Sequence, residues 1–222
     1  MPPGAEIDIG AAVKTLRRIV KQWKTPVVTT YSRGSARPAF HVLISCILSL
    51  RTKDTQTAQA SARLFAVADT PEKLMELAPA RVEKLIYPVG FYRNKAVAVI
   101  EASRVIVEQY GGKTPDEIDE LLKLKGVGRK TANLVVTLGY GKPGICVDTH
   151  VHRISNIWGY VKTKTPEETE FALREKLPKR YWIEFNDLLV TFGQNLCAPV
   201  SPWCSKCPLA GECPRLGVKR FR

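Results

Sequence analysis

The amino-acid sequence predicts an all-α protein. Apolar residues recur at helical spacing through most of the chain, no segment alternates with a period of two, and no hairpin turn joins alternating runs. At 222 residues the chain is long enough for one large domain, or for two small domains that share a core. We therefore expect successive helices from residue 8 to the cysteine-rich segment near the C-terminus.

Three helices are expected in the N-terminal third of the chain. Residues 8–23 carry aliphatic side chains at helical spacing. Residues 39–50 are apolar on nearly every side, which is typical of a buried helix. Residues 53–68 continue the helical pattern. The segment 39–50 is therefore expected to form a central helix of the fold.

Turn and capping residues mark the next helices. Thr70 followed by Pro71 predicts a helix start. Residues 81–90 predict a short helix that ends in a Pro–Val–Gly turn. Residues 94–112 form a long periodic segment, and the glycine pair at its end predicts a C-cap.

Two segments open with the pattern Thr-x-x-Glu, which is typical of a capping box. They are residues 114–124, beginning at Thr114, and residues 165–177, beginning at Thr165. We expect the threonine to cap the helix in both. A last helix over residues 181–196 leads into the cysteine-rich segment.

The chain is strongly basic. It contains 34 Lys and Arg residues against 21 Asp and Glu residues, for a net charge of +13. Such an excess favours a polyanionic partner, and nucleic acid in particular, although charge alone does not exclude a basic protein without such a partner. Because the charge is spread along the chain, we expect a folded surface to bind the polyanion.

Nothing in the sequence predicts a membrane partner. No apolar run approaches the roughly 18–20 residues that cross a bilayer. The N-terminal segment carries acidic side chains where a signal peptide needs a basic region and an apolar stretch. We therefore expect a cytoplasmic, nucleoid-associated protein whose thiols stay reduced.

Four of the six cysteines lie within one short segment, at Cys197, Cys204, Cys207 and Cys213. Disulfides are disfavoured in a reducing compartment. Four thiolates suit either zinc or an iron–sulfur cluster, and zinc ribbons usually offer two Cys-x-x-Cys pairs where this segment has one. The residues alone leave both metals open.

Residues 121–141 contain a glycine-rich turn between two apolar stretches. One helix is expected to end near Leu124, and a second to begin around Arg129 and Lys130. A glycine turn lets the free N–H groups at the start of the second helix approach a phosphate closely. The alternative is a plain corner between two helices.

Three motifs in register resemble those of the endonuclease III family of DNA glycosylases. They are the helix–hairpin–helix at residues 124–132, the Val-Asp-Thr-His-Val-His-Arg segment at residues 147–153, and the cysteine spacing over residues 197–213. Residues 43–56 and 89–96 are also similar to segments of that family. The resemblance covers nearly the whole chain.

The resemblance implies a fold of two helical lobes with a DNA-binding cleft between them. Residues 32–142 would form a six-helix-barrel-like lobe that contains the helix–hairpin–helix. Residues 1–31 and 143–222 would form the second lobe, in which the four cysteines hold a [4Fe–4S] cluster. The protein would act as a monomer on double-stranded DNA that carries a damaged base or an abasic site.

The resemblance also implies the chemistry. Lys130 would attack C1′ of a flipped-out nucleotide, displace a damaged pyrimidine and form a Schiff base, and β-elimination would then cut the strand 3′ to the lesion. A neighbouring cation and the helix N-terminus would favour the neutral, reactive amine. Asp148 alone is typical of an N-cap. With Lys130 it would also stabilise positive charge on the sugar, and we expect both roles.

Further DNA contacts follow from the same motifs. The hairpin and the cysteine-rich loop would bind the backbone through Gly126, Val127, Gly128, Arg129 and Lys206. His150 is expected either to line the pocket or to be a hydrogen-bonded structural residue. Because His150 and His152 are two residues apart, they face different sides of a helix, which argues against a shared metal site.

Arg51 stands where many relatives have glutamine, and Phe91 stands at the position of an apolar wedge. Phe91 would replace the stacking that is lost when a nucleotide flips out. Arg51 would contact the opposite base, and its guanidinium favours guanine. The alternative is that Arg51 turns outward to a phosphate.

Two other functions remain as alternatives. The first is a mismatch glycosylase of the same superfamily, acting on U:G or T:G, whose members lack the catalytic lysine. The second is a non-catalytic iron–sulfur protein that binds DNA. Lys130 paired with Asp148 argues against both.

Overall fold

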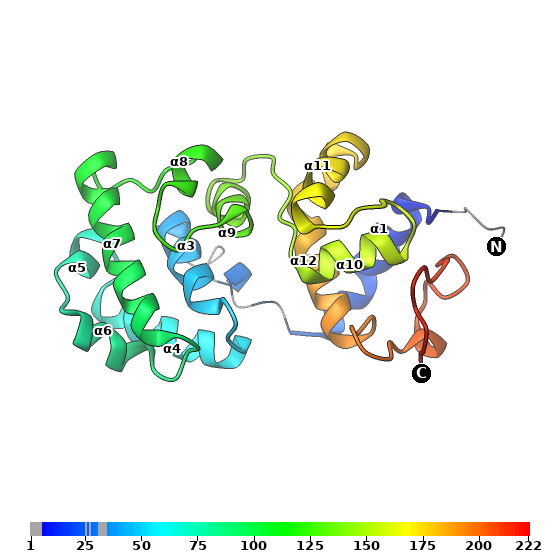
Figure 1. The fold of residues 1–222 in the computed structure, drawn as a ribbon, viewed down its shortest axis with the longest axis horizontal. Helices are drawn as coiled ribbons and strands as arrows, with labels where there is room; N and C mark the ends of the chain where they lie inside the picture. The colour runs from blue at the N-terminus through cyan, green and yellow to red at the C-terminus, as the bar shows by residue number, and fades with distance from the viewer. Residues whose placement is uncertain (1–5, 25, 27, 31–34) are drawn as a thin grey trace. The chain divides into compact units, whose positions relative to one another are not determined.

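The structure is a computed structural model that describes residues 6–24, 26, 28–30 and 35–222, drawn in Figure 1. These residues form helices, turns and loops and contain no β-strand. The prediction of an all-α fold is confirmed. In this part of the chain, no helix combines the length and the hydropathy needed to cross a membrane.

The chain divides into two compact units. One unit comprises residues 1–26 and 145–222, and the other comprises residues 27–144. The expected boundary between residues 31 and 32 lies outside the described residues. The expected boundary at residue 142 lies just before the observed one.

The unit of residues 27–144 is built around one apolar helix. Its helices are α3 (Pro38–Ser49), α4 (Asp54–Val67), α5 (Pro71–Met75), α6 (Pro79–Ile86), α7 (Tyr92–Tyr110), α8 (Ile118–Leu122) and α9 (Arg129–Leu134), and α9 continues as a π-helical turn (Val135–Gly139). In Figure 1, α3 lies between α7 and α9. Nine of its twelve residues are buried. The expected central helix is therefore confirmed.

Gly139 brings the π-helical turn directly against α3. A Cβ atom at Gly139 would lie 2.7 Å from the Cα of Ala39, closer than real Cβ atoms come. Thr137 of this turn donates from its hydroxyl to the carbonyl of Asn133 in α9 at 2.7 Å. The second helix of the hairpin is thus packed on α3 backbone to backbone.

The other unit surrounds helix α12. Its elements are α1 (Ile9–Ile19) with a 3-10 turn (Val20–Gln22), α10 (Thr149–Ile157), α11 (Pro166–Lys176), a 3-10 turn (Lys179–Tyr181), α12 (Trp182–Asn195) and a 3-10 turn (Cys204–Lys206). Helix α12 packs against α1 and α10. Trp158, Phe185 and Phe192 lie at the centre of its core, and the cysteine-rich loop packs against the same core.

Most of the predicted caps are confirmed. The side chain of Thr70 accepts a hydrogen bond from the N–H of Lys73 at 3.3 Å, and that of Thr165 accepts one from Glu168 at 3.1 Å. Gly111 ends α7 with a φ of +57°, in the left-handed region that glycine adopts readily. These local signals place three helix ends correctly.

The predicted cap at Thr114 is wrong. Helix α8 begins four residues later, at Ile118, and no side chain caps it. The carboxylates of Asp116 and Glu117 instead bind the ammonium group of Lys142, at 3.2 and 2.6 Å. Ion pairs to a distant residue therefore hold this segment outside the helix.

Candidate active site

The glycine-rich turn joins α8 to α9 as predicted. Val127 is buried and donates from its backbone to the carbonyl of Leu124 at 3.1 Å. Gly126 has a φ of +79°, which a residue with a side chain rarely adopts. Gly128 is the N-cap of α9, and apart from its chain neighbours no atom of the described residues lies within 4 Å of the position that its Cβ would occupy. A phosphate can therefore approach the start of α9 closely.

Arg129 and Lys130 are the first two residues of α9, and both side chains are partly buried. Lys130 lies close enough to the thiol of Cys46 on α3 for its charge to act on that group. Burial raises the pKa of Cys46 to about 12, and the charge of Lys130 opposes this rise. Lys130 is thus held at the start of a helix, beside the apolar core of its own unit.

Asp148 is the N-cap of α10, as predicted. Its Oδ1 atom accepts hydrogen bonds from the N–H groups of His150 and Val151, each at 2.9 Å. Its side chain is partly exposed. Among the described residues, Oδ2 has no hydrogen-bond partner. One oxygen is therefore fixed by the helix, and the other remains available to a substrate.

The two histidines of α10 have different neighbours. The ring of His150 packs against Gly193 of α12, where a Cβ atom would lie 2.3 Å from His150 Nδ1. The Nδ1 atom of His152 lies 2.7 Å from the hydroxyl of Thr169. Their rings therefore do not converge on a shared metal site. His150 is partly buried and packs against α12 of its own unit.

Arg153 connects α10 to the cysteine-rich loop. Its guanidinium donates to the carbonyl of Cys197 at 2.5 Å and lies 3.6 Å from the Sγ atom of the same residue. Helix α10, which Asp148 caps, is thus hydrogen-bonded from its middle to the first of the four clustered cysteines.

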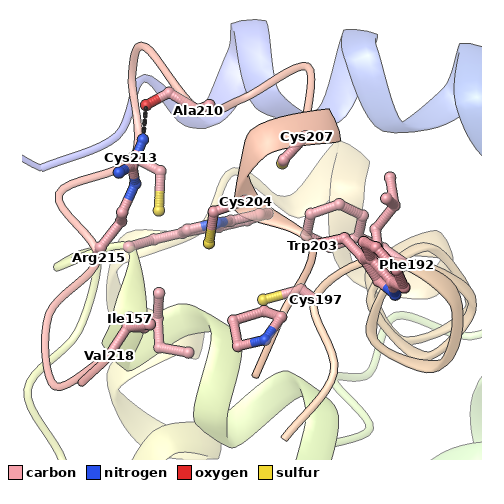
Figure 2. Close-up of a pocket in the computed structure, with 13 residues that line it drawn as sticks. Ile157, Phe192, Cys197, Trp203, Cys204, Cys207, Ala210, Cys213, Arg215 and Val218 are labelled. Atoms are coloured by element: carbon pink, nitrogen blue, oxygen red, sulfur yellow. Dashed lines mark hydrogen bonds between the residues drawn. The ribbon is translucent and has the colours of Figure 1, made fainter. Parts of the chain in front are cut away.

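The four clustered cysteines line one pocket, shown in Figure 2. Ile157 and Val218 also line this pocket. No cysteine of the chain forms a disulfide. Within the described ranges, no three Cys, His, Asp or Glu side chains are grouped so that they could hold a metal ion.

Burial raises the pKa of three of these thiols. The pKa of Cys207 rises to about 11, and those of Cys197 and Cys213 rise as well. A cation beside a thiol opposes this rise and favours the thiolate, as Arg153 does at Cys197. Cys46 and Cys146 lie outside the pocket and are buried, as expected for small apolar side chains.

Stacked cations hold the cysteine-rich loop in shape. The ammonium group of Lys206 lies 4.9 Å from the ring centroid of Trp203, and the guanidinium of Arg222 lies 3.9 Å from it. The backbone N–H of Arg222 also donates to the carbonyl of Pro202 at 2.8 Å. Lys206 is exposed at the surface of this loop, where it can reach a phosphate.

The structure brings Arg51 and Phe91 together. The guanidinium carbon of Arg51 lies 5.7 Å from the ring centroid of Phe91, although forty positions separate the two residues in sequence. Both have a positive φ, of 51° and 57°. The side chain of Phe91 is unusually exposed for an aromatic residue, at 61%. A cation and an aromatic ring thus form one exposed pair.

Sequence reasoning missed Lys95. Its side chain is 6% exposed, and its ammonium group donates to Leu48 O at 2.7 Å, Leu50 O at 2.5 Å and Thr52 Oγ1 at 3.0 Å. The available signal was its position on the apolar face of α7, four residues before the buried Val99. A lysine on that face requires acceptors inside the protein.

Comparison with known proteins gives consistent matches. The profile of the HhH-GPD superfamily of base excision DNA repair proteins matches residues 44–179. The chain is 52% identical over 174 residues to Endonuclease III of Thermotoga maritima, covering 78% of this chain and 82% of that protein. It is 39% identical over 182 residues to Endonuclease III of Bacillus subtilis, covering 82% and 83%.

A solved structure matches over a similar length. It is a trapped covalent intermediate of endonuclease III with DNA, in an estranged-adenine complex. The match has a TM-score of 0.76 and a sequence identity of 32%, and it covers 91% of this chain and 95% of that one.

Proposed function

The chain belongs to the endonuclease III family of the HhH-GPD superfamily, and we infer that it is a bifunctional DNA glycosylase and abasic-site lyase of base excision repair. It removes damaged, oxidised pyrimidines from duplex DNA and cuts the strand 3′ to the lesion. The observation that carries this inference is the position of Lys130 at the start of α9, directly after the phosphate-accessible turn.

The hairpin binds the DNA backbone. The first N–H groups of α9 have no acceptor within the helix, and the positive end of the helix dipole favours an anion there. Gly126, Val127 and Gly128 form the turn that leads to this position, and Arg129 is the first residue of the helix. A net charge of +13 adds sequence-independent attraction to the polyanion.

Lys130 supplies the nucleophile. Its neutral amine attacks C1′ of the flipped-out nucleotide, so that a bond from Nζ to C1′ forms and the bond from C1′ to the base breaks. Ring opening gives a Schiff base. Loss of a proton from C2′ then expels the 3′ phosphate by β-elimination, and water releases the sugar fragment from the lysine.

Asp148 assists this attack through its charge. Positive charge develops on the sugar as the base leaves, and a fixed carboxylate lowers the energy of that state. Because two backbone N–H groups hold Oδ1, the carboxylate does not have to be ordered during the reaction. The free Oδ2 is the oxygen we assign to the sugar.

We propose that Cys197, Cys204, Cys207 and Cys213 hold a [4Fe–4S] cluster. The four cysteines line one shared apolar pocket, and four thiolates are the ligands of such a cluster. Such a cluster would hold the loop in place through four iron–thiolate bonds.

Replacing Cys204 with alanine is expected to remove the cluster. Purified wild-type protein should be yellow-brown, with a broad absorbance near about 400 nm from thiolate-to-iron charge transfer. Cys204→Ala should lose this absorbance, whereas Cys146→Ala, a buried cysteine outside the pocket, should keep it. Colourless wild-type protein with one zinc ion per chain after anaerobic purification would contradict the assignment.

We also propose that Arg51 and Phe91 occupy the gap that the flipped nucleotide leaves. Phe91 stacks in the gap, and Arg51 contacts the base opposite. A guanidinium matches the two acceptors of guanine, and such a bidentate contact contributes about 1–3 kcal/mol of discrimination.

This assignment predicts a preference for lesions opposite guanine. Wild-type protein should excise one lesion at least about fivefold faster opposite guanine than opposite adenine, and Arg51→Gln should bring the ratio close to one. The measurement is single-turnover base removal from duplexes that differ only in the opposite base. Equal wild-type rates opposite guanine and adenine would rule out the assignment.

A further inference from the structure

Arg51 and Phe91 are held in backbone conformations that they do not prefer. Four residues other than glycine have a positive φ in the described part of the chain, and these two are in contact with each other. Such strain persists only where the surrounding structure fixes it. Contacts near these residues should therefore hold the pair in place.

Lys95 supplies these contacts on the side of Arg51. Its ammonium group has three N–H donors, and it binds Leu48 O, Leu50 O and Thr52 Oγ1. The two carbonyls belong to the C-terminal end of α3, where a cation is favourable. Lys95 thus fixes the chain both before and after Arg51.

Lys95 is also hydrogen-bonded to Phe91. The backbone N–H of Lys95 donates to the carbonyl of Phe91 at 3.1 Å, in the first turn of α7. One residue therefore connects, through its backbone and its side chain, the two loops that carry the exposed pair.

Thr52 completes the connection. Its hydroxyl oxygen accepts from the ammonium group of Lys95 and from the backbone N–H of Gly90, each at 3.0 Å. A Cβ atom at Gly90 would lie 2.7 Å from the carbonyl oxygen of Arg51, so the two loops touch through their backbones. The two loops are therefore linked to each other, with the ammonium group of Lys95 at the centre of their hydrogen bonds.

Lys95 is a costly residue at this place. Burial lowers its pKa to about 8, and no carboxylate pairs with it among the described residues. A buried cation without a carboxylate is rare, and its N–H groups must find acceptors inside the protein. An apolar residue would pack on α3 without this cost, but it could not bind the three acceptors.

We propose that Lys95 is a positioning residue that holds Arg51 and Phe91 ready to enter the gap left by a flipped nucleotide. This inference rests on the proposed function. Flipping unstacks the nucleotide and leaves its partner base unpaired, and side chains that are already in position replace these contacts with little loss of entropy. If the loops were separate, the pair would have to be ordered at each turnover.

The test compares Thr52→Val with Thr52→Ser. Valine has nearly the shape of threonine but cannot accept either hydrogen bond, whereas serine keeps the hydroxyl. Lys95→Met removes the donor and keeps the length of the side chain. Entry of Arg51 and Phe91 into the gap is measured through the fluorescence of 2-aminopurine placed opposite a stable abasic-site analogue. An unstacked 2-aminopurine is brighter than a stacked one.

Thr52→Val and Lys95→Met should weaken the fluorescence change and slow base removal from duplex DNA about tenfold or more. Thr52→Ser should stay within about twofold of wild type. Cleavage of an abasic site in single-stranded DNA has no opposite base to displace. It should therefore stay close to the wild-type rate in every variant.

Two results would overturn the inference. One is a folded Thr52→Val protein with wild-type fluorescence and duplex rate. The other is an equal loss on single-stranded and duplex substrates, which would mean that the bonds merely support the fold. If Lys95→Met does not fold, the comparison of Thr52→Val with Thr52→Ser still tests the inference. A wild-type protein that displaces the probe but cannot cleave abasic DNA would refute the proposed function instead.

Discussion

Replacing Lys130 with glutamine is expected to abolish strand cleavage and covalent capture. Borohydride reduces a Schiff base to a stable amine, so wild-type protein should become attached to DNA that contains an abasic site. Glutamine keeps most of the length of the side chain but has no nucleophilic amine. The rate of β-elimination should fall by about 10³-fold or more, and duplex binding should remain.

Lys125→Gln is the matched control. Lys125 is an exposed lysine on the same hairpin, and its ammonium group lies 2.6 Å from a carboxylate oxygen of Glu101. This variant loses the same positive charge and should still be captured. If Lys130→Gln protein cleaves an abasic duplex at the wild-type rate in a single-turnover assay, another group is the nucleophile.

Asp148→Asn is expected to lose base removal while the fold stays intact. Asparagine caps helices about as well as aspartate, so the melting temperature should barely change. The carboxylate charge is removed, however, and the charge that develops on the sugar loses its partner. We expect single-turnover base removal to slow by about 10²–10³-fold, in the range seen when a transition-state contact is deleted.

Asp8→Asn provides the same change at a cap without a proposed catalytic role. Asp8 caps α1 through hydrogen bonds from the N–H groups of Gly10 and Ala11, at 2.8 and 3.1 Å. The Asp8→Asn protein should excise bases at the wild-type rate. If the two asparagine variants lose activity equally, the effect comes from the caps and Asp148 has no catalytic charge effect.

The local parts of the fold were predictable from the sequence, and the distant contacts were not. Thr70, Thr165 and Gly111 fix helix ends through bonds within a few residues, so their patterns sufficed. Thr114 carries the same pattern but fails. The acidic residues after it bind Lys142, which lies more than twenty positions away.

The candidate site shows the same difference between local signals, which the sequence carries, and distant contacts, which it does not. Asp148 and the turn before Lys130 were predicted because a helix start has a local signature. The pairing of Arg51 with Phe91 could be proposed only by resemblance, and their positive φ angles could not be proposed at all. Lys95 was missed because its acceptors, apart from Thr52, are backbone carbonyls, which carry no sequence signature.

The two buried cysteines outside the pocket of the four clustered cysteines give each unit its own reporter of unfolding. Cys46 lies in the unit of residues 27–144 and Cys146 in the other, and both are 2% exposed. A thiol reagent reacts with such a group only when the surrounding structure opens. The labelling rate of each cysteine therefore measures how often its own unit opens. Equal rates would indicate that the units open together, and unequal rates would give their separate free energies of opening.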